Sequence, residues 1–85
     1  MELYIIYGIS DCPACLQAQA ALMAKDKEYV FVNGDFSKTY RDSIKEEFQW
    51  TTFPIIIKVT PESEELLGGY DDLCYVLEKE SKAPT

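Results

Sequence analysis

Two cysteines three residues apart, Cys12 and Cys15, stand between a short apolar run and a helix-forming run. The preceding run, Leu3–Tyr7, is apolar or aromatic at every position, which is typical of a strand covered on both faces. The following run, Ala14–Lys25, is rich in alanine, leucine and methionine, all good helix formers. We therefore expect a strand, a turn over Gly8–Asp11, and a helix that begins at the cysteines.

The rest of the chain continues this alternation. Further strands and helices are expected, in chain order, over Tyr29–Val32, about 37–48, Ile55–Val59, Glu64–Leu67 and about 71–81. In the second helix, apolar residues four apart predict one stripe facing the core, at Tyr40, Ile44 and Phe48. The order β-α-β-α-β-β-α favours right-handed crossovers and a sheet with helices on its faces. We predict one α/β domain over residues 1–85, with a flexible tail over 82–85.

The charge balance disfavours several classes of function. Fifteen acidic residues against eight basic ones give a net charge of −7, which repels phosphate backbones and anionic membranes. We therefore expect neither nucleic-acid binding nor membrane binding. The apolar stretch Leu3–Ile9 is too short to span a membrane and lacks the basic flank of a signal peptide, so a reducing cytoplasm is the expected compartment.

Three cysteines and no histidine restrict the chemistry further. An odd count with two cysteines so close together is not a structural disulfide framework. A tetrahedral zinc site wants four ligands, usually cysteine and histidine, so no metal site is expected. Cys74 stands beside Leu73 in the last predicted helix, where a lone cysteine usually behaves as a small hydrophobe.

A Cys-x-x-Cys pair at the start of a helix indicates a redox centre. The two sulfurs lie one turn apart and can form a small disulfide ring. Unpaired N–H groups and the helix dipole stabilise the first thiolate, which lowers a cysteine pKa from its ordinary ~8.5. We predict that Cys12 attacks a substrate disulfide and that Cys15 releases the mixed disulfide. Pro13 suits the first helical turn because its missing N–H would have no partner there.

Three blocks of the chain together resemble the glutaredoxin family of the thioredoxin-like superfamily. Tyr7–Cys15 is a strand leading into C-P-x-C, and Thr52–Ile57 is similar to the family's T-V-P-x-I-F-I segment. Gly68–Leu73 is similar to its G-G-x-D-D-L segment. The resemblance spans nearly the whole chain. It implies a thioredoxin-like fold, with a four-stranded mixed sheet flanked by three helices, and thiol–disulfide oxidoreductase activity with glutathione.

The resemblance also implies a cis peptide bond between Phe53 and Pro54, beside the cysteines. The backbone of Phe53 would pair with the extended backbone of a bound thiol, with Thr52 beside it. From the residues alone, Pro54 could instead be the first residue of a strand.

A second set of glutathione contacts is implied at the start of the last helix. Tyr70 and Asp71 would contribute backbone groups to a carboxylate of glutathione, and Asp72 would hold its ammonium. From the residues alone, the two aspartates could be ordinary acids in the first turn of a helix.

Two departures from the family pattern bear on affinity. The family often carries a basic residue three positions before the first cysteine and another shortly before the T-V-P segment, where this chain has Ile9 and Trp50. Their loss should weaken binding of an anionic tripeptide, unless Lys38 or Gln49 compensates. Trp50 could be either a core residue or an exposed indole beside the site. Ala14 replaces a common tyrosine.

The resemblance leaves three functions open. The first is a monomeric, glutathione-dependent dithiol glutaredoxin that reduces protein disulfides or glutathione mixed disulfides, with ribonucleotide reductase as a candidate client. The second is an NrdH-type redoxin recharged by thioredoxin reductase, which the missing basic residues favour. The third is a carrier of a [2Fe–2S] cluster shared between two protomers and two glutathiones, which Pro13 disfavours.

Overall fold

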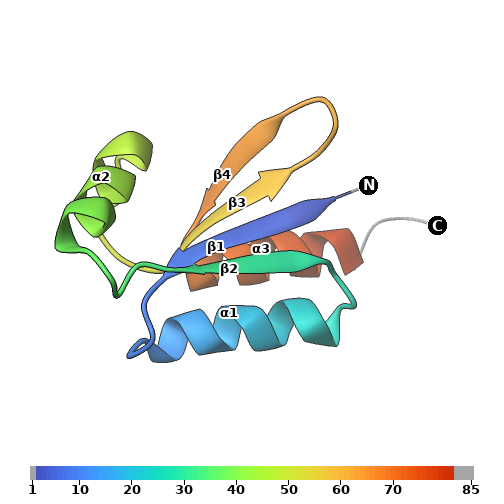
Figure 1. Cartoon of the computed structure of the whole chain (residues 1–85). Helices are drawn as coiled ribbons and strands as arrows, with labels where there is room; N and C mark the ends of the chain where they lie inside the picture. Colours follow the sequence, from blue (N-terminus) through green and yellow to red (C-terminus); the bar gives the residue numbers. More distant parts are fainter. Residues whose placement is uncertain (1, 82–85) are drawn as a thin grey trace.

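The computed structural model describes residues 2–81, in which strands and helices alternate along the chain (Figure 1). In order, the elements are β1 (Leu3–Gly8), α1 (Pro13–Ala24), β2 (Tyr29–Asn33), α2 (Lys38–Phe48), β3 (Ile55–Val59), β4 (Glu64–Gly68) and α3 (Tyr70–Ser81). The predicted order is confirmed, and each boundary lies within one residue of its prediction. The tail expected over 82–85 lies outside the described residues. No helix in the described part of the chain is both long and apolar enough to cross a membrane.

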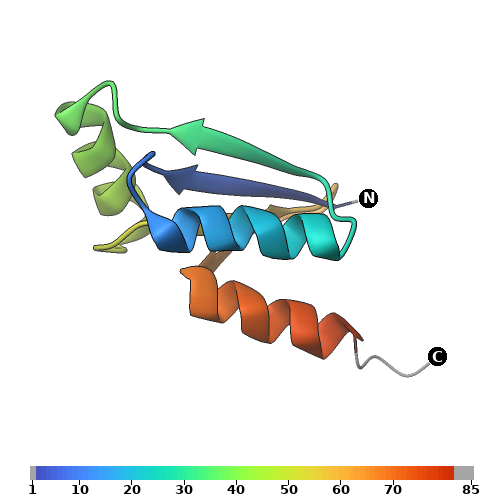
Figure 2. The ribbon, with the colours of Figure 1, turned by 90° about the horizontal axis from the view of Figure 1, so that it is seen from below.

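The strands form one mixed sheet in the order β2-β1-β3-β4. β1 and β2 run parallel and are joined through α1, whereas β1–β3 and β3–β4 are antiparallel. Helices α1 and α3 lie side by side on one face of this sheet (Figure 2). Between them and the sheet lies the main core, formed by Tyr4, Ile6, Ala18, Leu22, Ile56, Leu73 and Leu77.

The opposite face of the sheet is covered only in part, by α2. The side chain of Ser37 accepts the N–H of Tyr40 at 3.1 Å and starts this helix. The predicted apolar stripe is confirmed, because Ile44 is buried and Tyr40 and Phe48 pack against the same cluster.

Along β1, residues alternate between buried and half-buried, so the prediction of a strand covered on both faces is wrong for the α2 side. Tyr4 and Ile6 are fully buried, but Ile5 and Tyr7 are only half-buried. The physical reason is the position of α2, an 11-residue helix that lies toward the carboxyl end of β1 and leaves the rest of this face uncovered (Figure 1).

Glu2, the residue before β1, forms ion pairs with two lysines that are distant in the sequence. Its carboxylate lies 3.1 Å from Nζ of Lys58 and 3.3 Å from Nζ of Lys27. The hydrogen bond from Lys58, with the charge of Lys27, holds the pKa of the Glu2 carboxyl below its ordinary value. A pKa lowered by folding means stability that is present above the ordinary pKa and lost as the pH falls through the lowered one.

We expect Glu2→Gln to lower the free energy of unfolding by about 0.5–1 kcal/mol at neutral pH, as for a partly exposed ion pair. The difference from wild type should shrink as the pH falls below the ordinary carboxyl pKa and through the lowered one, because Glu2 is then protonated in both states. Urea unfolding at several pH values measures it, with the exposed Glu62→Gln as control. A difference that stays the same at every acidic pH at which the protein remains folded would contradict the assignment.

Candidate active site

The two cysteines meet where α1 begins. Cys12 is the N-cap residue of α1 in an extended conformation, and its Cα lies 5.2 Å from that of Cys15, with which it forms a disulfide. The N–H of Cys15 donates to Sγ of Cys12 at 3.2 Å. Cys15 is 1% exposed, whereas Cys12 is half-buried. A substrate can therefore reach Cys12 but not Cys15, and an N–H group already points at the outer sulfur.

Gly8, the last residue of β1, allows the strand to pass close to the inner cysteine. A Cβ atom at this position would lie 2.7 Å from Sγ of Cys15 and 2.9 Å from the ring of Phe31. The carbonyl of Gly8 accepts the N–H of Gly34 at 2.7 Å, which ties the end of β1 to the residue after β2. The resulting close contact leaves no room for a side chain at position 8.

The loop before Cys12 is anchored by a carboxylate that the sequence did not reveal. Both the N–H and the hydroxyl of Ser10 donate to Asp35, the N–H at 3.2 Å. The hydroxyl bond is the main cause of a lowered pKa at Asp35. Arg41 in turn donates to the carbonyls of Gly34 at 2.9 Å and Asp35 at 3.3 Å. The loop leading to Cys12 is thus linked to the loop before α2.

A segment from the second half of the chain lies against the disulfide. The Phe53–Pro54 peptide bond is cis, as the resemblance implied. The carbonyl oxygen of Phe53 lies 3.9 Å from Sγ of Cys12. Pro54 is buried and precedes β3, whose first residue, Ile55, pairs with Tyr7 of β1. This antiparallel pairing brings Phe53 to the cysteine end of β1.

The start of α3 follows a turn of two glycines. Gly68 has a φ of 118°, a conformation that favours glycine, and a Cβ there would lie 3.0 Å from the ring of Trp50. The N–H of Gly69 donates to Oδ2 of Asp72 at 3.0 Å. Asp72 thus reaches back to the residue before the helix, in the manner of a capping box. The alternative of an ordinary helix-start acid is therefore present in the structure.

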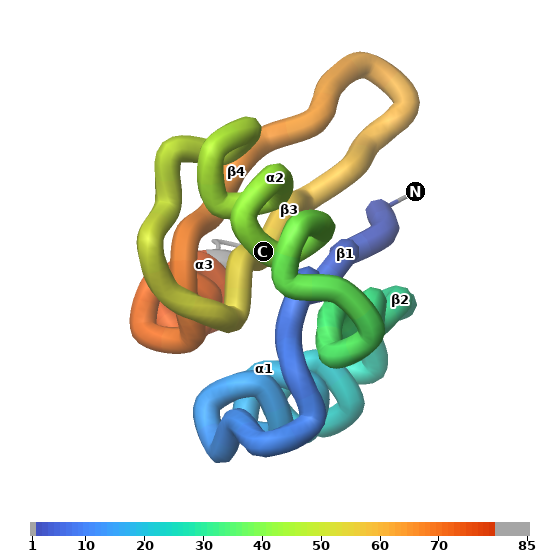
Figure 3. The backbone as a smooth tube through the Cα atoms, turned by 60° about the vertical axis from the view of Figure 1, so that its left-hand side comes forward, coloured from blue at the N-terminus to red at the C-terminus, as the bar shows by residue number. Residues whose placement is uncertain are grey.

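These segments enclose an open groove of about 270 Å³ beside the cysteines. Figure 3 shows the segment between α2 and β3 next to the start of α3. The lining residues are Ala14, Trp50, Thr52, Phe53, Pro54, Gly69, Tyr70, Asp71 and Asp72. All six residues expected to contact glutathione line this one groove. The sequence interpretation had left the place of Trp50 open and had not assigned Ala14 or Gly69 to this groove.

A family model described as glutaredoxin matches residues 4–59, more than half of the chain. The chain belongs to the glutaredoxin family. It is similar to the solved glutaredoxin from Brucella melitensis, with 34% identity, a TM-score of 0.70, and coverage of 93% of this chain and 80% of that one. A comparison with curated proteins gave no match.

Two more distant solved structures show the fold alone. A dithiolic glutaredoxin from Trypanosoma brucei brucei is 24% identical with a TM-score of 0.67, covering 93% of this chain and 79% of that one. Glutaredoxin 1 from Francisella tularensis is 16% identical with a TM-score of 0.65, covering 98% and 100%. The expected thioredoxin-like fold, with four strands in a mixed sheet and three helices, is confirmed. Membership implies thiol–disulfide oxidoreductase chemistry in general, with Cys12 and Cys15 as the Cys-x-x-Cys pair.

The charges around the groove of this glutaredoxin differ from the family pattern. Within residues 2–81, its lining contains two aspartates and no lysine or arginine. Lys38 forms an ion pair with Asp42 at 2.8 Å, and Gln49 ends α2 in the left-handed conformation. Neither of these two candidate replacements lines the groove.

Lys45 is the cation that the sequence interpretation missed. Its Nζ lies over the ring of Phe53, 5.2 Å from the ring centroid, in the last turn of α2. A lysine in the last turn of a helix is common because it complements the helix dipole, so nothing in the sequence distinguishes this one.

Trp50 combines features of the two alternatives, a core residue and an exposed indole beside the site. It is half-buried and lines the groove, and its Nε1 is buried with no hydrogen-bond partner in the described part of the chain. An aromatic wall thus occupies the place of a basic residue.

Proposed function

We propose that this protein is a dithiol glutaredoxin that reduces protein disulfides or glutathione mixed disulfides and is recharged by glutathione. The supporting observation is the single groove beside Cys12 that gathers all six residues expected to contact glutathione. These residues come from two segments, 52–54 and 70–72, that are distant in sequence. Glutathione as cosubstrate, and its contacts, are part of the proposal.

The catalytic cycle uses the disulfide of this structure as its oxidised form. The thiolate of Cys12 attacks a substrate disulfide, forming a mixed disulfide and expelling one substrate thiolate, which takes up a proton. Cys15 then loses its proton and attacks Sγ of Cys12. The second substrate thiol leaves, and the Cys12–Cys15 disulfide forms. Two electrons have passed to the substrate. Two glutathione molecules return them in two exchanges and leave as glutathione disulfide.

The groove offers distinct contacts for each part of glutathione. The backbone of Phe53, beside Cys12, would pair with the cysteinyl residue of the tripeptide. The first N–H groups of α3 attract a carboxylate, and Asp72 would hold the ammonium next to it. Lys45, over the ring of Phe53, would supply the positive charge that Ile9 and Trp50 do not.

An assay coupled to glutathione reductase and NADPH, with a glutathione mixed disulfide as substrate, tests the proposal. We expect turnover that depends on glutathione.

Lys45→Met should raise the KM for glutathione about two- to fivefold, the size of one exposed charge interaction, with little change in kcat. Lys38→Met is the matched control, because Lys38 is on the same helix but pairs with Asp42. Equal effects of both substitutions would remove Lys45 from the site.

A second candidate function is an NrdH-type redoxin recharged by thioredoxin reductase. It is favoured by the lack of lysine or arginine in the groove lining of residues 2–81 and by the net charge of −7. Both disfavour an anionic donor. Rates measured with thioredoxin reductase plus NADPH, and with glutathione plus glutathione reductase, separate the two. A hundredfold preference for thioredoxin reductase would replace the leading proposal.

The remaining expectations belong to the same proposal. The protein would act as a monomer in a reducing cytoplasm, with ribonucleotide reductase among its clients.

The iron–sulfur alternative requires glutathione at the same groove and an exposed Cys12 thiolate, and Pro13 next to Cys12 disfavours that use. Iron–sulfur absorption in anaerobically purified protein would revive it.

A further inference from the structure

The sheet face away from α1 and α3 carries a row of apolar side chains across all four strands. Val30 of β2 pairs with Ile5 of β1, Ile5 with Ile57 of β3, and Ile57 with Leu66 of β4, so all four point to the same face. The two ends of the row are open, because Val30 is 46% exposed and Leu66 38% exposed. The helix α2 covers this face only toward the carboxyl end of β1, and the row itself runs across the strands (Figure 1).

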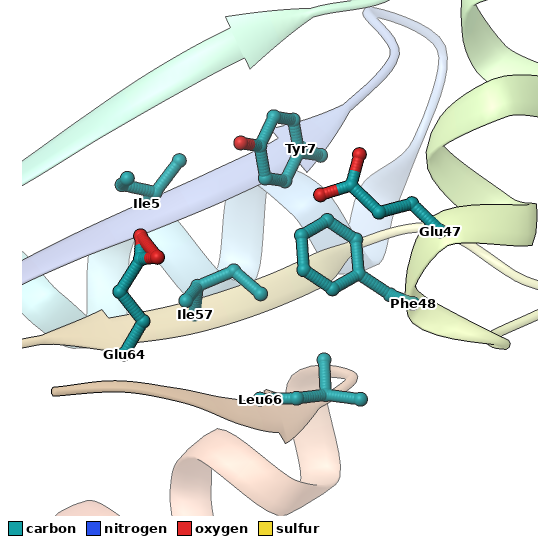
Figure 4. Close-up of a pocket in the computed structure, with 7 residues that line it drawn as sticks. All are labelled: Ile5, Tyr7, Glu47, Phe48, Ile57, Glu64 and Leu66. Atoms are coloured by element: carbon teal, nitrogen blue, oxygen red, sulfur yellow. The ribbon is translucent and has the colours of Figure 1, made fainter.

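A groove of about 350 Å³ runs between this row and α2. It is lined by Ile5, Tyr7, Glu47, Phe48, Ile57, Glu64 and Leu66 (Figure 4). The rings of Tyr7 and Phe48 pack together at 5.7 Å between centroids and form one wall. This groove shares no lining residue with the groove beside the cysteines.

Two carboxylates from different elements stand at the rim. Glu47 belongs to α2 and Glu64 to β4, and in Figure 4 both side chains reach toward the groove. Both residues are exposed, and within residues 2–81 neither carboxylate has a salt bridge or hydrogen bond. Burial, the nearby Tyr40 and the charges of Glu47 and Glu64 together raise the pKa of the Tyr7 hydroxyl. The two negative charges therefore act on the same space.

The lining combines an apolar floor with unpaired negative charge and contains no basic residue in the described part of the chain. A lysine or arginine side chain complements it, because its methylene stem can lie on apolar surface while its cationic head meets a carboxylate. A second copy of this chain fits poorly, because each copy carries a net charge of −7.

We propose that this groove docks a segment of a partner protein that presents lysine or arginine side chains between apolar ones. The apolar neighbours of the basic residue would lie on the row from Leu66 to Val30. The cationic heads would lie between Glu47 and Glu64. This proposal does not depend on glutathione as the electron donor.

The pentapeptide acetyl-Val-Lys-Leu-Lys-Val-amide, titrated into the full-length oxidised protein and followed by amide chemical shifts, tests the proposal. We expect shifts at Ile5, Tyr7, Ile57 and Leu66. Binding should weaken about fivefold or more in the double variant Glu47→Gln/Glu64→Gln, or when glutamine replaces both peptide lysines, as for the loss of two exposed charge pairs. Leu66→Thr should also weaken binding, since it removes apolar surface at an exposed position.

The double variant Glu62→Gln/Glu65→Gln is the matched control. It removes the same charge, but Glu62 lies in the turn after β3 and Glu65 alternates to the other face of β4. It should bind the peptide within about twofold of wild type. Equal weakening in both double variants would show general charge attraction and overturn the proposal. So would shifts confined to the cysteine groove, or shifts on dilution that show a second copy on this face.

Discussion

Replacing Cys12 with serine should leave the protein folded and remove its disulfide reductase activity. A serine hydroxyl stays protonated where a thiol ionises, and it cannot form or exchange a disulfide. We expect a loss on the order of 10³-fold or more, as for other enzymes that lose their nucleophile. Cys12 is half-buried at the start of α1, so the loss of its sulfur should cost little stability.

Two matched variants separate the roles of the three cysteines. Cys15→Ser should still attack a substrate disulfide but fail to resolve it, so a mixed disulfide on Cys12 accumulates and is visible by mass spectrometry. Cys74→Ser should keep activity within about twofold, because Cys74 lies on α3 outside the cysteine pair. If Cys12→Ser retained wild-type activity, or if Cys12→Ser accumulated the mixed disulfide on Cys15, the assignment of roles would be wrong.

Gly8→Ala should be strongly destabilising for so small a change. The new Cβ would lie 2.7 Å from Sγ of Cys15 and 2.9 Å from the Phe31 ring, closer than Cβ atoms come to other groups in proteins. Overpacking of this kind costs about 1–3 kcal/mol because neighbouring groups must move. One of the groups that must move is the resolving cysteine. We therefore expect both a lower free energy of unfolding and slower release of the mixed disulfide.

Gly34→Ala is the control for this prediction. Its Cβ would meet Cγ of Arg41 at 3.1 Å, the stem of a flexible side chain that can shift. Its cost should stay below about 1 kcal/mol, within the range of ordinary substitutions. Urea unfolding of the oxidised proteins measures both. Equal stability of Gly8→Ala and wild type would show that β1 does not press against Cys15 as the structure indicates.

Local sequence signals predicted the elements of this fold well. The cysteine pair with Pro13 and the glycine pair before α3 act on their immediate neighbours, and each marks an element end within one residue. Hydrophobic periodicity likewise identified the buried stripe of α2 at Ile44. These features depend on residues a few positions apart, which is the range over which a sequence pattern is informative.

The candidate site required more than local patterns. Nothing in the periodicity places Phe53 beside Cys12 or opposite the start of α3, because those contacts depend on how strands pair across the sheet. The family resemblance supplied them. It could not supply Lys45, whose position over Phe53 depends on the packing of α2.

The extent of burial on the α2 side of the sheet could not be predicted from the sequence either. Ile5 and Tyr7 read as residues of a doubly covered strand, yet they border an open groove. An apolar side chain has the same identity whether it faces a helix, a partner or water. The extent of cover depends on the length and position of α2, which the composition of β1 does not encode.

In the proposed mechanism, the start of α1 holds Cys12 as a thiolate, and Cys15 lies one turn further into the helix. The most direct measurement is the rate at which iodoacetamide alkylates Cys12 in the reduced protein as a function of pH. The protein is digested after each reaction time, and mass spectrometry of the peptides gives the alkylated fraction of each cysteine. We predict that the Cys12 rate reaches its plateau well below the ordinary cysteine pKa of ~8.5, whereas Cys15 reacts far more slowly. A Cys12 rate that still rises through pH 8.5, in step with free cysteine, would contradict the account.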